Sequence, residues 1–153
     1  MDALELKVPP PAVALVTALA MWAIARGTFA FEVAAGWRIA VAVVLAVVGG
    51  AISAAGIAAF RRARTTLSPM RPAAASSLVT DGIYRHTRNP MYVGLLLALV
   101  AWAAFLGAPW TLLGPLLFVA YITRFQIRPE ERALGAAFGE AYDRYRSSVR
   151  RWL

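Results

Sequence analysis

Four long apolar stretches leave this chain few folds to adopt. They cover about Pro10–Ala25, with an extension toward Phe31, then Trp37–Phe60, Met91–Gly107 and Trp110–Thr123. A helix needs roughly 20 mostly apolar residues to cross a bilayer, where its backbone hydrogen bonds must be made internally. The last two stretches are short, and the tight link Gly107-Ala108-Pro109 joins them into a helical hairpin. The pattern predicts an all-α, polytopic membrane protein with about four transmembrane helices.

The composition excludes several other classes of protein. The 153 residues are 60% hydrophobic and 16% charged, whereas a soluble domain is about 45–50% apolar and about 25% charged. A chain this apolar is neither a small water-soluble globule nor disordered. The absence of cysteine excludes disulfides, thiolate nucleophiles and cysteine-ligated zinc, and the single histidine excludes a multi-histidine metal site. We therefore expect no metal site.

The distribution of arginine predicts how the chain lies in the membrane. Thirteen of the 16 cations fall between residues 61 and 90 or from residue 124 onward. The positive-inside rule places both regions in the cytoplasm, at the inner membrane if the source is prokaryotic. We expect these cations to contact anionic lipids, whereas no motif points to nucleic acid. A cleaved signal peptide is disfavoured, because Lys7 is the only cation before the first apolar stretch.

These features give a single domain, 1–153, in four parts. Residues 1–60 hold two transmembrane helices, residues 61–90 form a cytoplasmic loop, residues 91–127 form the hairpin, and residues 128–153 form a C-terminal amphipathic cytoplasmic helix. Within the loop, residues 65–79 are rich in Ser, Thr, Ala and Pro and are expected to be a flexible connection.

The loop ends in a segment, residues 81–94, that combines cations, aromatics, glycine and proline. Pro90 suits the first position of a helix and Asn89 its N-cap. The helix start, with Arg88 beside it, is a potential anion site. The alternative is an interfacial anchor with Tyr84 and Tyr92 in the aromatic belt of the membrane.

The C-terminal part has apolar residues at helical spacing between Pro129 and Val149, which predicts one amphipathic helix. Glu130 and Glu131 fall in its first turn, where the helix dipole already favours acids. Such a helix can simply lie on the membrane surface. Together, however, a basic helix start and adjacent carboxylates are suited to binding a zwitterion. His86 is unique, but it is expected to be an interfacial polar residue rather than a base.

Two motifs in these segments resemble a known family. The first is Gly82-x-Tyr84-x-x-x-Arg88-Asn89-Pro90-x-Tyr92-x-Gly94. The second is Glu130-Glu131-x-x-Leu134-x-x-x-Phe138-Gly139-x-x-Tyr142-x-x-Tyr145-x-x-x-Val149. Together, on either side of a hairpin, they resemble the isoprenylcysteine carboxyl methyltransferase family, which includes phospholipid methyltransferase-like bacterial proteins. The resemblance covers roughly residues 80–151.

The resemblance implies a small helical membrane enzyme that uses S-adenosylmethionine, enclosed between the two motifs on the cytoplasmic side. Arg88 would bind the carboxylate of the cofactor, and an acid its ammonium. The implied cofactor-binding residues are, on one side, Tyr84, Arg88, Asn89, Pro90, Tyr92 and Gly94 and, on the other, Glu130, Glu131, Tyr142 and Tyr145. Many relatives have histidine where this chain has Asn89, so a charged or titrating group at that position is in doubt here.

Methyl transfer from a sulfonium is an in-line displacement that depends chiefly on positioning. We expect Arg124 or Arg128 to orient the acceptor, and Glu130 to orient the cofactor or to remove a proton. The acceptor is expected to be a lipophilic carboxylate, thiol or amine that enters from the bilayer at the cytoplasmic face. Because four spans enclose little protein, a homodimer is left open.

Two alternatives stand beside this function. Membrane sterol reductases that use NADPH have a related helical architecture, and binding of an adenine dinucleotide would distinguish them. The non-enzymatic alternative is a small membrane scaffold or transporter. A transporter is expected to carry ionisable groups in mid-membrane, and the second to fourth apolar stretches hold none between their ends.

Overall fold

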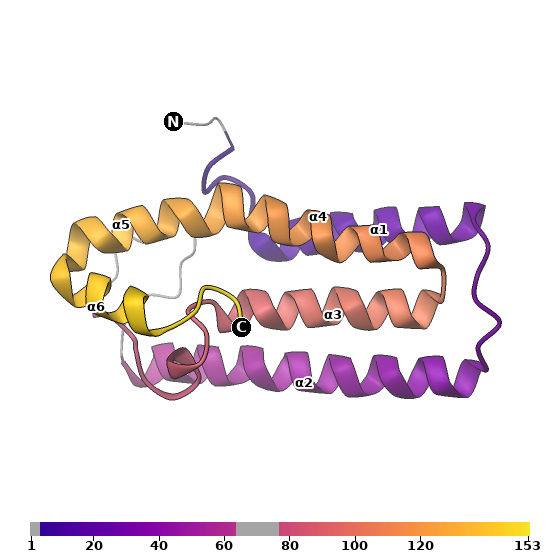
Figure 1. Ribbon diagram of the computed structural model, residues 1–153, viewed down its shortest axis with the longest axis horizontal. Helices are drawn as coiled ribbons and strands as arrows, with labels where there is room; N and C mark the ends of the chain where they lie inside the picture. Colours follow the sequence, from indigo (N-terminus) through magenta and orange to yellow (C-terminus); the bar gives the residue numbers. More distant parts are fainter. Residues whose placement is uncertain (1–3, 64–76) are drawn as a thin grey trace.

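The computed structural model describes residues 4–63 and 77–153, and the elements within them are helical. Figure 1 shows the long helices lying along the longest axis of the molecule and alternating in direction, with the C-terminal helices at one end. They are α1 (Pro10–Gly27), α2 (Ala35–Arg62), α3 (Pro90–Leu106) and α4 (Leu113–Ile122), followed by α5 (Arg128–Phe138) and α6 (Glu140–Ser148). The predicted all-α architecture is confirmed. The connection predicted over residues 65–79 lies for the most part outside the described residues.

Length and apolar composition qualify three helical segments to cross a membrane: α1, α2 and the continuous helical rod Pro109–Phe138, which includes α4 and α5. Helix α3 is apolar but shorter, at 17 residues. The rod has 30 residues and is therefore about 45 Å long, whereas the hydrocarbon core is only about 30 Å thick. Its apolar part ends at Thr123, so α5 extends beyond the membrane-spanning part.

Small residues bring α2 and α3 together, and these two helices make the most extensive contact in the bundle. A Cβ atom on Gly94 would lie 2.6 Å from the carbonyl oxygen of Gly49, and one on Gly56 would lie 3.1 Å from Pro90 Cγ. Close backbone approach of this kind gives apolar helices dispersion contacts that larger side chains would prevent. Gly49 and Gly56 of α2 thus permit the close packing of α3, whereas a Cβ atom on Gly50 would meet nothing within 4 Å.

The C-terminal region departs from the prediction of one helix over Pro129–Val149. The helix does not begin at Pro129, because α5 continues the rod through a π-helical turn, Thr123–Ile127, which we call the π turn. It also ends at Gly139, whose φ of 51° and ψ of −128° reverse the chain before α6. Such a positive φ suits glycine, which lacks the Cβ atom that disfavours it. Glycine inside a helical pattern therefore marked a corner that folds α6 back toward α3.

Candidate active site

The start of α3 lies against the last residues of the chain. Pro90 occupies the first turn, and Asn89 stands at the predicted N-cap position. The Asn89 side chain does not cap the helix, because its Nδ2 donates instead to the carbonyl of Arg151, 2.8 Å away. The backbone N–H of Arg88 donates to the carbonyl of Arg150 at 3.0 Å. The C-terminal tail is thus held beside the helix start that sequence reasoning identified as a potential anion site.

Proline explains the π turn. A proline inside a helix has no N–H to offer the carbonyl four residues earlier, and its ring clashes with that carbonyl. For Pro129 this carbonyl belongs to Phe125, in the π turn itself. The wider turn replaces the α pattern locally, and the N–H of Arg128 donates to the carbonyl of Thr123, five residues earlier. π turns of this kind occur frequently at functional sites.

The π turn presents Gln126 to Glu130, which forms the centre of the site. Gln126 Nε2 and the Tyr92 hydroxyl both donate to Glu130 Oε1, each at 2.6 Å. Gln126 and Tyr92 are buried. Burial raises the pKa of Glu130 to about 7, although hydrogen bonds from both donors favour its charged form. The carboxyl group therefore titrates near neutral pH. Both donors bind the same oxygen, Oε1.

Glu131 points into a second cluster, with two arginines. Arg88 Nη2 donates to Glu131 Oε1 at 2.6 Å, while Arg151 binds both carboxylate oxygens at 2.9 and 2.7 Å. Burial opposes the charge of Glu131, but these hydrogen bonds outweigh it and hold its pKa below the ordinary value. Arg88 Nη1 also donates to the carbonyls of Arg146 and Val149, which satisfies the end of α6. We call Arg88, Glu131 and Arg151 the arginine clamp.

Tyrosines join the loop before α3 to α6. Tyr84 lies in the 3-10 turn Gly82–Arg85 and packs the edge of its ring on Phe60 of α2, with the centroids 5.5 Å apart. The Tyr145 hydroxyl donates to the carbonyl of Tyr84 at 2.8 Å. Burial raises the pKa of both hydroxyls, so both stay protonated. Tyr142 is buried, and burial raises its pKa to about 12.

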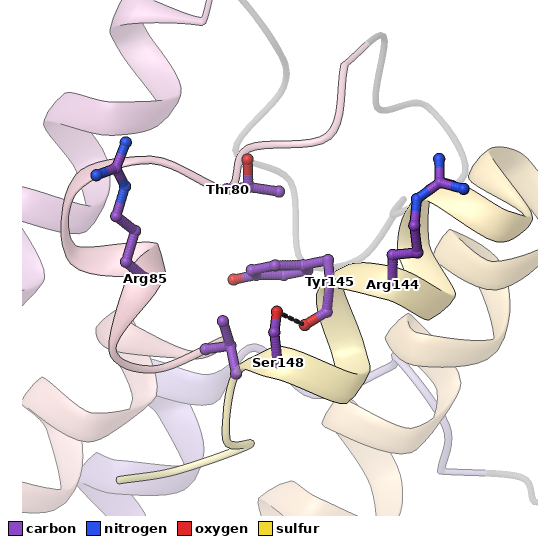
Figure 2. A pocket seen from close by; sticks show the side chains of 6 residues that line it. Thr80, Arg85, Arg144, Tyr145 and Ser148 are labelled. Carbon is purple, nitrogen blue, oxygen red and sulfur yellow. Dashed lines mark hydrogen bonds between the residues drawn. The ribbon is translucent and has the colours of Figure 1, made fainter.

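Beside this contact lies an open groove of about 450 Å³ between the 3-10 turn and α6. In Figure 2 the ring of Tyr145 lies between Arg85 on one side and Arg144 on the other. Ser148 Oγ donates to the carbonyl of Tyr145 at 3.0 Å, and Thr80 lines the groove from the loop. The groove is cationic, but both arginines are exposed and have acidic partners one helical turn away.

The remaining predicted residues lie at different distances from this centre. Pro90 and Gly94 face α2 and serve its packing. Arg124 donates to Glu5 Oε1 at 3.2 Å, and Arg128 is exposed. The structure therefore brings together Tyr92 with Glu130, Arg88 with Glu131, and Tyr84 with Tyr145. The proposed cofactor and acceptor roles of all these residues remain predictions.

Three contributors were missed by sequence reasoning: Gln126, Arg151 and Glu5. The position of Gln126, four residues before Glu130, is a helical neighbour pair that the sequence could have revealed. Nothing in the sequence pairs Glu5 with a residue more than a hundred positions away. Within residues 4–63 and 77–153, no group of three or more His, Asp or Glu side chains is arranged to hold a metal ion.

Comparison with known proteins identifies the family of the chain. The profile of the family described as phospholipid methyltransferase matches residues 37–141, more than half of the chain. A protein of Haemophilus influenzae, described as uncharacterized, is 48% identical over 63 residues, which are 41% of this chain and all of that protein. No solved structure matches the chain.

A second relative carries a functional name. The protein-S-isoprenylcysteine O-methyltransferase of Schizosaccharomyces pombe is 37% identical over 75 residues, which are 47% of this chain and 30% of that enzyme. The match thus spans less than a third of that enzyme's length. The chain belongs to the phospholipid methyltransferase family, a family of S-adenosylmethionine-dependent membrane methyltransferases, and is a distant homologue of isoprenylcysteine O-methyltransferase.

Proposed function

We propose that this protein transfers a methyl group from S-adenosylmethionine to a lipophilic acceptor, with Glu130 as the central carboxylate of the site. The observation that carries the proposal is the setting of this side chain. Two buried donors hold Glu130 Oε1, and no described residue donates a hydrogen bond to Oε2. A carboxylate fixed through one oxygen, beside the first turn of the apolar helix α3, is suited to accept hydrogen bonds from a ligand with its other oxygen.

The donor set around Glu130 suits the cofactor. S-adenosylmethionine, when bound, supplies an electrophilic methyl group on a sulfonium, and it also carries an ammonium and ribose hydroxyls. Glu130 Oε2 is suited to accept from either of these, while Tyr92 and Gln126 fix the carboxyl group in place. Arg88 is already occupied by Glu131 and two carbonyls. Its predicted contact with the cofactor carboxylate would therefore require some of these contacts to exchange.

The acceptor class follows from the same carboxyl group. A thiolate or carboxylate acceptor is already nucleophilic, whereas an amine or hydroxyl must lose a proton. A general base works best when its pKa lies near the operating pH, and the pKa of Glu130 is about 7. We infer that Glu130 is able to deprotonate such an acceptor as well as to orient the cofactor. In this proposal the acceptor enters from the lipid at the cytoplasmic face, where the basic segments gather.

Calorimetric titration of S-adenosylhomocysteine into purified protein in lipid nanodiscs tests the proposal. We expect micromolar binding by the wild type and its loss in Glu130→Gln. Glu140→Gln is the matched control, because that carboxylate is on α6 with its side chain 94% exposed. If the wild type and Glu130→Gln bind S-adenosylhomocysteine equally well, Glu130 is not part of the cofactor site. If the folded wild type binds no S-adenosylhomocysteine and NADPH binds instead, the reductase alternative replaces the proposal.

A further inference from the structure

A short N-terminal turn, Leu4–Lys7, lies against the outer side of the π turn. Its Glu5 carboxylate bridges two arginines of the rod: Oε1 accepts from Arg124 at 3.2 Å and Oε2 from Arg132 at 2.5 Å. The Glu5 side chain is only 10% exposed, whereas those of Arg124 and Arg132 are 43% and 58% exposed. A carboxylate this buried must be neutralised by its partners. Glu5 therefore depends on both arginines.

The same turn supplies a backbone donor to the π turn. The N–H of Leu6 donates to the carbonyl of Phe125 at 3.1 Å. This is the carbonyl that Pro129, lacking an N–H, cannot satisfy from within an α-helix. Leu6 has a φ of 56°, the only positive φ at a non-glycine residue among those described. Such a conformation persists where surrounding contacts fix it, and here Glu5 and the Phe125 carbonyl do so on either side.

These contacts attach the N-terminal turn to the rod at three points that flank Gln126 and Glu130. Arg124 and the Phe125 carbonyl precede Gln126 and Glu130 in the chain, and Arg132 follows them. We propose that Glu5 is a positioning residue of the site: by clamping Arg124 and Arg132 it fixes the π turn that directs Gln126 to Glu130. The inference rests on the proposed function only in taking Glu130 as the central carboxylate.

The family resemblance does not supply this role. The family profile begins at residue 37, so the N-terminal turn lies outside the matched residues. The contacts also change the interpretation of Arg124, which sequence reasoning assigned to the acceptor. In the structure its guanidinium neutralises Glu5, so its charge is shared with a group of this chain.

The test observes the Glu130 carboxyl group directly. The chain holds five glutamates, so labelling with [5-¹³C]glutamate gives five carboxyl signals by NMR, and Glu130→Gln assigns the one of interest. In full-length Glu5→Gln protein in nanodiscs, we expect the Glu130 signal and its titration midpoint to move. Binding of S-adenosylhomocysteine should weaken about fivefold or more, the size of a modest coupling between contacts. Glu32→Gln, at an exposed position between α1 and α2, is the control and should change neither.

Two further comparisons make each outcome decisive. Arg132→Gln removes one of the two arginine partners of Glu5, so it should move the Glu130 signal in the same direction even if Glu5→Gln fails to fold. A folded Glu5→Gln protein whose Glu130 signal matches that of the Glu32→Gln control overturns the inference. If the signal moves but the wild type binds no S-adenosylhomocysteine, the positioning role stands and the proposed function fails.

Discussion

Replacing Glu131 by glutamine tests whether the arginine clamp holds the C-terminal tail to α3. Arg88 and Glu131 have only 9% and 12% of their side chains exposed and lie 2.6 Å apart. Removing one partner of a buried ion pair typically costs about 3–5 kcal/mol, because the remaining charge stays desolvated. The Arg151 side chain is 37% exposed and can return to water, and glutamine still accepts one hydrogen bond. We therefore expect Glu131→Gln to lower the free energy of unfolding by about 3 kcal/mol.

The measurement is an equilibrium titration with SDS in mixed micelles, followed by the fluorescence of the five tryptophans. Glu140→Gln is the matched control, since its pair with Arg144 spans 3.5 Å and is 94% and 75% exposed. An exposed pair of this kind contributes about 0.5 kcal/mol or less. If Glu131→Gln is no less stable than Glu140→Gln, the clamp does not hold the tail and the reasoning is refuted.

The same carboxylate predicts a dependence on pH. The folded pKa of Glu131 lies below its unfolded value, which is about 4.3. Its stabilisation is therefore complete above the unfolded pKa and is lost as the pH falls through the folded one. The wild type should lose stability relative to Glu131→Gln below about pH 4, and titrations at several acidic pH values will show whether the difference narrows.

Three further changes have defined outcomes. Gly94→Ala should destabilise the bundle by about 1–3 kcal/mol, because a Cβ atom there meets the backbone of α2. Gly50→Ala is the control and should not destabilise the bundle, because the space around Gly50 is open. Thermal unfolding of the two variants tests this prediction. Tyr92→Phe removes a hydrogen bond that lowers the pKa of Glu130. The titration midpoint of the Glu130 carboxyl group, followed by its ¹³C signal, should therefore rise above about 7. Pro129→Ala restores a helical N–H and should retain or raise stability while weakening S-adenosylhomocysteine binding; unaltered binding would contradict a role for the π turn.

The helices of the bundle were predictable because their cause is local. A run of apolar residues that must satisfy its backbone inside lipid has no alternative to a helix, so α1, α2 and α3 begin and end within a few residues of the expected positions. Proline and glycine were harder to interpret. Pro129 is equally consistent with a helix start and with a π turn inside a helix. The structure shows the second case, because the helix that precedes Pro129 continues through it.

The partners within the site were only partly predictable, because contacts between distant segments depend on how the bundle packs. Tyr92 and Glu130 were both named from motifs, yet the hydrogen bond between them joins residues 38 positions apart. Arg151 was treated as one more basic residue of a cytoplasmic face. Its role depends on the corner at Gly139, which reverses the chain and returns the tail to the start of α3.

The location of the site follows from the cost of polar groups in lipid. A charged or strongly polar side chain at mid-membrane is unfavourable unless it is paired or hydrated, so a bundle this thin has room for such groups only where its helices emerge. At that end Glu130 is shielded enough for its pKa to rise to about 7, and it is hydrogen-bonded to Tyr92 in the first turn of the apolar helix α3. The two conditions are not met together elsewhere along the rod: before Thr123 a carboxylate would lie among apolar side chains or against lipid, and beyond Phe138 it would be exposed to water. If Glu130 accepts a proton from a lipophilic substrate, as we propose, it does so at the one favourable position that this fold offers, to which Pro129 and the π turn direct it.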